Sequence, residues 1–331
     1  MTGAVIGWYA HHLGSGHVTT ARLVGRLTRT PVVILSSASR PADWPSERWV
    51  DLPLDDALGG HDHTAGGALH WAPLGHPGYR DRMSAIAEWV RTARPAAMLT
   101  DVSVEVTLLA RLLGVPVATM LMAGDRSDGP HQLAFDAASL LFAPFPGGAD
   151  VTRGRRPEWE AKTVWLGAMS RFDDRASVPP HGGRRVVMLW GHGGSTVTER
   201  DVQAAEAATP DWTWTRCAAS DADQVWALLQ SADVVVAHAG QSVVAEVAAA
   251  RRPAVIVPQP RPHDEQRCLA AGLAELGLTP RLDGWPDPAA WATLLESAHR
   301  SDPGRWVAWS DGGGARRMAE RLDQLAGEGA A

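Results

Sequence analysis

The chain of 331 residues is long enough for two α/β domains, and its hydrophobic content of 45% can supply a core to each. Its formal net charge of −6 argues against a nucleic-acid binder that works through a basic surface, but it leaves room for a local basic pocket. Two cysteines provide neither a disulfide framework nor a zinc-finger pattern. Without a secretion signal or a membrane-spanning apolar run, we expect a cytoplasmic enzyme with no stable membrane insertion.

The N-terminal half alternates strand and helix signals, which is the pattern of a parallel sheet covered by helices. Apolar spacing predicts strands at 4–9, 31–35, 97–100 and 115–120, and helices at 18–27, 83–92 and 104–113. The stretch 51–78 is rich in Gly, His, Pro and Asp, so we expect long loops there.

A second series of the same kind follows a linker rich in Pro and Gly at 173–185. Strands are predicted at 185–190, 212–217, 234–237 and 254–258, and helices at 199–208, 224–231, 243–250, 264–276, 288–297 and 314–326. The expected fold is α/β, with two Rossmann-like doubly wound domains facing across a cleft. We place the N-terminal domain at 1–165 and the C-terminal domain at 166–304, and expect a helix at about 305–328 to pack back on the first.

The first glycine-rich loop joins the first predicted strand to the first predicted helix and contains Gly14, Ser15 and Gly16. Glycines there allow backbone N–H groups to approach an anion or a sugar at a helix N-terminus, although a tight βα turn would need them too. A dinucleotide fingerprint fails, because Thr19 stands at the third glycine position and no acidic residue ends the second strand.

A second glycine-rich loop, with Gly193, Gly194 and Ser195, opens the second series in the same position between strand and helix. No Gly-Lys-Ser/Thr sequence follows a glycine-rich loop, so a P-loop is excluded. Two such loops, one opening each domain, favour a ligand that spans the cleft.

The segment 238–246 follows an apolar strand and begins a helix whose first N–H groups can bind a diphosphate. Glu246 lies further along this helix, where a carboxylate can accept hydrogen bonds from two ribose hydroxyls. The alternative is a solvated helix residue, but the apolar flanks predict burial, and a buried Glu needs a partner. The candidate donor-binding residues here are His238, Gly240, Gln241, Ser242 and Glu246.

A proline-rich loop then leads into the helix predicted to begin at Asp264. Prolines lower the entropy of the free loop, which suits a preorganised site. Asp264, Glu265 and Gln266 can bond sugar hydroxyls, while Asp264 as an N-cap is the structural alternative.

In these motifs the C-terminal half resembles family 28 glycosyltransferases, which include the bacterial enzyme that adds N-acetylglucosamine to the lipid-linked peptidoglycan precursor. The similarity covers about residues 166–274, with a weaker match at 14–17. Arg171 ends the family's Gly-x-x-x-Arg segment, whose Arg approaches the diphosphate. Residues 193–195 match its Gly-Gly-Ser loop, and Gly240 and Glu246 match its Ala-Gly-x5-Glu segment. Gln266 matches its Asp-x-Gln-Gln segment, in which Arg267 replaces the second Gln.

The resemblance implies the GT-B fold and inverting transfer without a tightly bound cofactor or metal. The co-substrate would be a nucleotide-diphosphate sugar, a UDP-sugar by family precedent, with UDP-N-acetylglucosamine as the family's example. We expect the partner to be a small soluble acceptor with a hydroxyl or amine, such as a natural-product intermediate, because no basic rim beside exposed apolar residues indicates a membrane surface.

An inverting transfer needs a base for the acceptor proton, and His17 is the first candidate because its ordinary pKa suits proton transfer near neutrality. Its alternative is a phosphate-contacting or structural histidine. Asp101 is the second candidate, and Glu105 is the third; His11 and His12 are candidates for the acceptor side.

Two motifs resemble metal sites. The sequence Asp-Ala-Asp at 221–223 precedes a predicted helix and is interpreted as an N-cap. The sequence His-Asp-His at 61–63 is interpreted as part of a polar loop.

Two other functions use the same motifs. A UDP-sugar 2-epimerase shares the double-Rossmann scaffold, but the glycine-rich loops and the Asp-Glu-Gln sequence fit a transferase better. A degenerate subunit without catalysis would not need to retain Arg171, Glu246 and Gln266 together.

Overall fold

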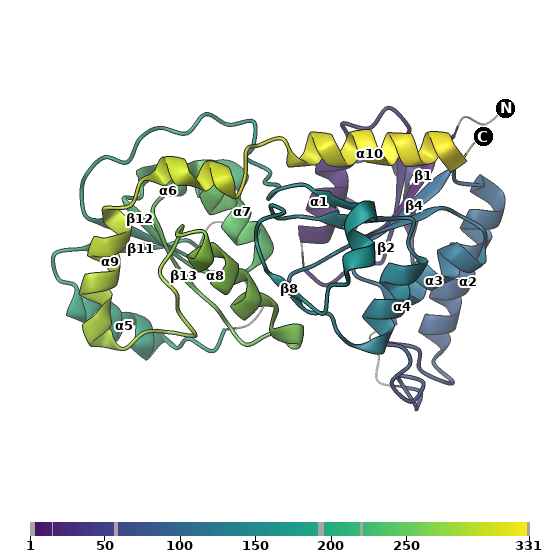
Figure 1. Ribbon diagram of the computed structural model, residues 1–331, viewed down its shortest axis with the longest axis horizontal. Helices are drawn as coiled ribbons and strands as arrows, with labels where there is room; N and C mark the ends of the chain where they lie inside the picture. Colours follow the sequence, from purple (N-terminus) through teal and green to yellow (C-terminus); the bar gives the residue numbers. More distant parts are fainter. Residues whose placement is uncertain (1–3, 15, 56–58, 191–194, 219–220, 330–331) are drawn as a thin grey trace.

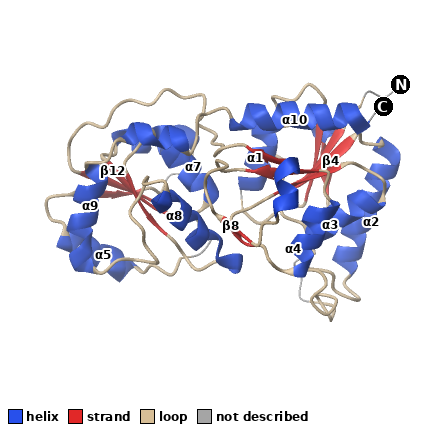
Figure 2. Ribbon diagram, viewed as in Figure 1, coloured by secondary structure: helices blue, strands red, loops and turns tan. Residues whose placement is uncertain are grey.

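The computed structural model describes residues 4–14, 16–55, 59–190, 195–218 and 221–329. Two α/β units lie side by side, each with a central sheet between helices (Figures 1 and 2). Among the described residues, no helix combines the length and apolar character needed to cross a membrane.

The first unit contains a parallel seven-stranded sheet. Its strands are β1 (Ile6–Tyr9), β2 (Val32–Ser36), β3 (Trp49–Asp51), β4 (Ala97–Thr100), β5 (Val117–Met120), β7 (Leu140–Ala143) and β9 (Thr163–Trp165). Their spatial order is β3-β2-β1-β4-β5-β7-β9. Every residue of β1, β4, β5 and β7 is buried, as expected for parallel strands covered on both faces.

Helices and short pieces complete this unit: α1 (Gly16–Gly25), η1 (Ser46–Arg48), α2 (Pro77–Ala93), α3 (Val104–Leu112), α4 (Gly129–Ala137) and η2 (Pro157–Lys162). A separate two-stranded pair joins β6 (Gly124–Asp125) to β8 (Thr152–Arg153).

The second unit has a parallel four-stranded sheet made of β10 (Arg185–Leu189), β11 (Thr213–Arg216), β12 (Val234–His238) and β13 (Ala254–Val257). The order is β11-β10-β12-β13. Its helical segments are α5 (Glu199–Ala208), α6 (Ala222–Ser231), α7 (Gln241–Ala250), η3 (Pro262–Asp264), α8 (Glu265–Glu275), η4 (Pro288–Ala290), α9 (Trp291–His299) and η5 (Pro303–Ala308).

Each sheet has a point where the strand order reverses direction, between β1 and β4 in the first and between β10 and β12 in the second. Ligands of doubly wound sheets bind in the crevice outside the carboxyl ends of the strands at such points. The two glycine-rich loops, Asp101 and the start of α7 all follow strands that flank these points.

The last helix, α10 (Gly314–Gly329), leaves the second unit and runs along the first, with its C-terminal end near the N-terminus of the chain (Figure 1). Its apolar side chains, among them Met318 and Leu322, are buried in the core that contains Ile6 and Trp8 of β1. The carboxylate of Asp323 accepts hydrogen bonds from the backbone N–H groups of Arg29 and Thr30, each at 2.9 Å.

The predicted fold class is confirmed, but the sequence interpretation missed several elements. No element was predicted between residues 121 and 165, where the structure has β6, α4, β7, β8, η2 and β9. Strands of two to four residues carry little periodic signal. Helix α4 had a signal that was overlooked, because Asp128 caps it and proline occupies its first turn.

Two capping predictions have opposite outcomes. Asp221 caps α6 by accepting hydrogen bonds from the N–H groups of Asp223 and Gln224, which confirms the N-cap interpretation. Asp264 occupies the N-cap position of α8 in a left-handed conformation (φ 55°), and its side chain makes no capping hydrogen bond. Asp264 therefore has the N-cap position given to it as the structural alternative but lacks the capping hydrogen bond, and the helix begins one residue later than predicted.

Candidate functional site

The starts of α1 and α7 face each other between the two units. A Cβ atom built on Gly16 would lie 2.9 Å from the Oγ of Ser242, so a glycine allows this close approach. Both helices are ten residues long, and their first N–H groups carry partial positive charge. Partial positive charge at two adjacent helix starts favours a negatively charged ligand.

His17 lies in the first turn of α1, and its Nδ1 is 2.8 Å from Oδ2 of Asp101, which follows β4. The Asp101 carboxylate can only accept, so the His17 Nδ1 carries the proton and Nε2 is left as the basic atom. The two leading candidates for the catalytic base therefore form one hydrogen-bonded pair, which is the arrangement of a base with its orienting carboxylate.

The electrostatic surroundings of His17 favour its protonated form. Burial would lower the pKa of His17, but the charge of Asp101, its hydrogen bond and the charge of Glu265 together raise the pKa above its usual value. Glu265 comes from the second unit, so residues of both units act on this imidazole. Its own pKa is raised by burial, against the effects of Arg126, His17 and Arg261.

The backbone beside this pair is strained. Val102, the residue after Asp101, has a left-handed conformation with φ 61°. A β-branched residue rarely adopts this region, and such a conformation costs about 1–3 kcal/mol. The surrounding contacts must therefore stabilise this sharp turn at the end of β4.

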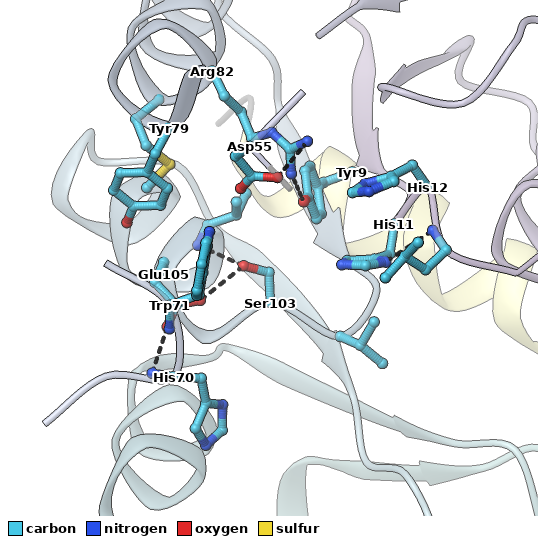
Figure 3. A pocket seen from close by; sticks show the side chains of 14 residues that line it. Tyr9, His11, His12, Asp55, His70, Trp71, Tyr79, Arg82, Ser103 and Glu105 are labelled. Carbon is cyan, nitrogen blue, oxygen red and sulfur yellow. Dashed lines mark hydrogen bonds and ion pairs between the residues drawn. The ribbon is translucent and has the colours of Figure 1, made fainter. Parts of the chain in front are cut away.

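A cavity of about 290 Å³, shown in Figure 3, is lined by Val102, the residue after Asp101, whereas His17 and Asp101 are not among its lining residues. His11 and His12 line it, and the His11 ring lies 5.9 Å from that of His17. The remaining lining is largely aromatic and polar: Tyr9, Leu13, Asp55, His70, Trp71, Tyr79, Arg82, Met83, Val102, Ser103, Glu105 and Val106. The size and the aromatic walls suit a small organic molecule.

Most polar side chains that line this cavity form hydrogen bonds or ion pairs with other residues of its wall. Arg82, only 3% exposed, forms an ion pair with Asp55 at 2.8 Å and donates a hydrogen bond to the hydroxyl of Tyr9 at 3.0 Å. Glu105 accepts hydrogen bonds from the backbone N–H groups of His70 (2.8 Å) and Trp71 (3.0 Å). Glu105, the third candidate base, thus holds a loop in place.

In the second unit, His238 ends β12 and its Nδ1 accepts a hydrogen bond from the N–H of Gly240 at 3.0 Å. Burial, and after it the charge of Arg261, lower the pKa of His238 to about 4. The ring is therefore neutral at pH 7 and shapes the start of α7. A Cβ on Gly240 would lie 2.4 Å from the Cε1 atom of this ring.

A chain of amide groups connects the proline-rich loop to Thr196, which follows the second glycine-rich loop in the sequence. The side-chain oxygen of Gln266 accepts from the N–H of Gln259 at 2.9 Å, and its Nε2 lies 3.4 Å from Nδ1 of His238. The side-chain oxygen of Gln259 accepts from both the N–H and the hydroxyl of Thr196, each at 2.9 Å. Gln259, which is 2% exposed, was not singled out from the sequence. The Pro-Gln-Pro sequence around it gave no indication of this contact.

Arg171 and Glu246 form an ion pair, with Nε of Arg171 donating to Oε1 of Glu246 at 2.8 Å. The Glu246 side chain is 12% exposed, so it has the partner that a buried carboxylate requires. Burial raises the pKa of Glu246 although Arg171 counteracts it. One Glu246 oxygen and the terminal nitrogens of Arg171 are outside this hydrogen bond, and they can still bind a ligand.

The other residues predicted to bind the donor make separate contacts. Asp264 lies 3.7 Å from a guanidinium nitrogen of Arg153 and 3.6 Å from one of Arg267. The hydroxyl of Ser195 accepts from Trp190 Nε1 and donates to the carbonyl of Val197, both at 3.0 Å. Gly14 has a left-handed φ of 88°, and Gln241 is the first residue of α7. Ser15, Gly193 and Gly194 lie outside the described residues.

Comparisons with known proteins fit this geometry. Residues 215–279 match the model of the glycosyltransferase family 28 C-terminal domain. MurG of Acinetobacter baumannii has a similar structure, with TM-score 0.63 and 15% identity over 97% of this chain and 99% of its own. The calicheamicin glycosyltransferase CalG4 gives 0.63 and 16% over 99% of each chain. UGT2 of Phytolacca americana, solved with UDP-2fluoro-glucose and pterostilbene, gives 0.62 and 13% over 99% and 100%. No curated protein sequence matches the chain.

The class of the protein follows from these findings. The structural similarity extends over nearly the whole of each chain, which confirms the predicted GT-B fold. The family match includes the segments 238–246 and 264–266, which confirms the predicted resemblance of the C-terminal half to family 28. Fold and matched domain together define a glycosyltransferase of the GT-B type with a family 28-like C-terminal domain.

Proposed function

We propose that the protein transfers a sugar, with inversion, from a UDP-sugar to a hydroxyl or amine of a small soluble acceptor. The observation that carries this proposal is the His17–Asp101 pair, which lies beside a cavity and next to the facing starts of α1 and α7. A base, an acceptor cavity and an anion-binding junction are the three parts that inverting transfer from a nucleotide sugar requires.

In this mechanism the acceptor binds in the cavity lined by His11 and His12, with its nucleophilic group at Nε2 of His17. His17 removes the proton as the acceptor atom bonds to the anomeric carbon. The bond from that carbon to the diphosphate breaks on the opposite face, so the configuration is inverted. Asp101 keeps the imidazole in the required tautomer and stabilises its protonated form.

The departing UDP takes the electron pair of the broken bond. The N–H groups at the start of α7 and the guanidinium of Arg171 would stabilise its diphosphate. Glu246 offers its second oxygen to the ribose hydroxyls. Gln266, Glu265 and His238 would face the sugar, for which N-acetylglucosamine is the family's example.

A uridine donor is supported by two observations. The family 28-like segment contains Gly240 and Glu246, and the solved UGT2 structure of the same fold contains a UDP-sugar analogue. We propose the same domain division as the sequence indicates, with a donor domain at 166–304 and an acceptor domain at 1–165. The packing of α10 on β4 and α1 supports assigning that helix to the acceptor side.

Calorimetric titration of the protein with UDP, TDP and GDP, in the presence of EDTA, tests the donor assignment. Tighter binding of UDP supports the proposal. Tighter binding of TDP or GDP would overturn the proposed uridine donor and leave the proposed transferase activity in place. If none of the three binds, the degenerate-subunit alternative becomes the better explanation. If the protein instead converts a UDP-sugar to its C2 epimer without any acceptor, the epimerase alternative is the correct one.

A further inference from the structure

Three histidines from distant parts of the chain converge between the two units. His70 lies in the loop before α2, His131 in the first turn of α4, and His263 in η3 of the second unit. Their ring centroids are separated by 4.3 Å (His70–His131), 4.8 Å (His131–His263) and 5.6 Å (His70–His263). One nitrogen from each ring lies within 4.8 Å of the others, and within the described part of the chain this is the one group of His, Cys, Asp or Glu with such spacing.

Asp128 lies within this group and orients two of its rings. Its Oδ1 is 2.9 Å from Nε2 of His70, and its Oδ2 is 2.6 Å from Nδ1 of His131 and 3.8 Å from Nδ1 of His263. Oδ1 also accepts the backbone N–H of His131, so the carboxylate is fixed at the start of α4. A carboxylate bonded to the outer nitrogen of a histidine is the usual support of an imidazole that ligates a metal.

The backbone that presents His263 is strained. His263 and Asp264 are consecutive non-glycine residues with left-handed φ values of 59° and 55°. Non-glycine residues keep this conformation only where the surrounding structure holds them in it. A Cβ atom on Gly124 would lie 2.6 Å from the carbonyl oxygen of His263, so the loop is packed tightly against β6 of the first unit.

One basic group opposes a cation at this place. Nη1 of Arg126 lies 3.1 Å from Nε2 of His131, and Nη2 donates to the carbonyl of Ala123 at 2.7 Å. A metal ion that binds Nε2 of His131 would replace the first of these contacts and leave the second intact. Arg126 therefore weakens metal binding without preventing it.

We propose that His70, His131 and His263 bind a divalent transition-metal ion such as Zn²⁺, with Asp128 as the carboxylate that orients two of the ligands. Three imidazoles suit zinc, copper and nickel better than magnesium or calcium. Zinc–nitrogen bonds of about 2.0–2.1 Å require the rings to move together by roughly an ångström. Two of the three histidines, His70 and His263, also line a second cavity of about 500 Å³, together with Asp128.

The site would connect the two units. His70 and His131 belong to the acceptor side, whereas His263 is two residues before Glu265 and three before Gln266 in the donor-side segment. A metal ion would hold that segment against β6 and fix the separation of the two halves of the cleft. This inference rests on the histidine geometry and is independent of the sugar donor.

The test uses tag-free protein freed of metal by EDTA and then titrated with Zn²⁺ by calorimetry, and with Co²⁺ by absorption spectroscopy. We expect one ion per chain and an intense visible Co²⁺ spectrum typical of tetrahedral nitrogen coordination. The variants H131Q and H263Q should each lose this spectrum. The variant D128N should bind Zn²⁺ roughly 10–100-fold more weakly, the usual effect of losing an orienting group.

The variant H61Q is the matched control, because His61 lies on the same loop as His70 but outside the histidine group. It should bind Zn²⁺ as the parent does, and circular dichroism establishes that each variant is folded. In the parent, Zn²⁺ should also slow amide hydrogen exchange both in α4 and in residues 262–266. Weak binding of several ions per chain, or equal binding by folded H131Q and H263Q, would overturn the site.

Discussion

At the scale of single residues, the fold joins His17 and Asp101, two separate candidates for the catalytic base, in one hydrogen-bonded pair. They are 84 positions apart in sequence and 2.8 Å apart in space. Asp101 and Glu265 raise the pKa of His17 despite its burial. As a general base, His17 must be neutral, so kcat/KM should fall as the pH drops below this raised pKa.

We expect D101N to move that acidic limb of the pH profile to lower pH, because the neutral amide no longer stabilises the protonated imidazole. E265Q should shift it in the same direction and by less. H17A should lower kcat by roughly 10²–10⁴-fold, the usual contribution of a general base. Initial rates from pH 5 to 9 measure all three, with H181A in the exposed linker as control. An unchanged limb in D101N would exclude His17 as the base.

The Arg171–Glu246 ion pair leads to a second prediction at this scale. E246A should weaken UDP binding roughly 10–100-fold, which corresponds to about 1.5–3 kcal/mol for a hydrogen bond to a charged group. Calorimetry measures the change, and E275A, at an exposed position of α8, should bind as the parent does. Parental UDP affinity in E246A would remove Glu246 from the donor site.

At the scale of elements, the start of α7 has room only for a glycine at position 240. Gly240 has an ordinary extended backbone (φ −78°), so glycine is not required there by conformation. It is required by space, because the His238 ring occupies the position that a Cβ would take. The ring also contacts Gln266, so the starts of α7 and α8 are connected through this imidazole.

We expect G240A to displace the His238 ring and to weaken UDP binding, at a cost in stability of about 1–3 kcal/mol for overpacking. Calorimetry and urea unfolding separate these two effects. G284A is the control, since a Cβ on Gly284 would meet nothing within 4 Å. If G240A binds UDP as tightly as G284A, the start of α7 does not contact the nucleotide.

At the scale of the whole molecule, α10 connects the end of the chain to its beginning (Figure 1). It covers the first sheet with Met318 and Leu322, and Asp323 satisfies two backbone N–H groups in the turn before β2. The first unit therefore includes a helix from the end of the sequence, and its stability depends on that helix.

We expect D323A to lower the free energy of unfolding by about 1–3 kcal/mol, because two backbone donors lose their acceptor in a buried place. Urea unfolding followed by circular dichroism measures this loss. E320A, at an exposed position of the same helix, should change the free energy by less than about 0.5 kcal/mol. Equal stability of the two variants would show that Asp323 does not anchor the helix.

Much of the fold was accessible from the sequence because strand and helix periodicities are local. The long apolar runs of β1, β12 and β13 and the spacing in α5, α6 and α7 predicted those elements to within a few residues. The short strands β6 and β8 were missed, since two residues have no periodicity. Their pairing depends on contacts between segments 28 residues apart.

The sequence by itself determined the two α/β series, the glycine-rich turns and the family 28-like motifs, because these depend on neighbouring residues. Tertiary structure alone decided which side chains meet. Strand order brings Asp101 to His17, and packing of the segment after β9 against α7 brings Arg171 to Glu246. The contact between the units brings His263 to His70 and His131. Such pairings depend on how sheets are ordered and how the units pack, and no local pattern encodes either.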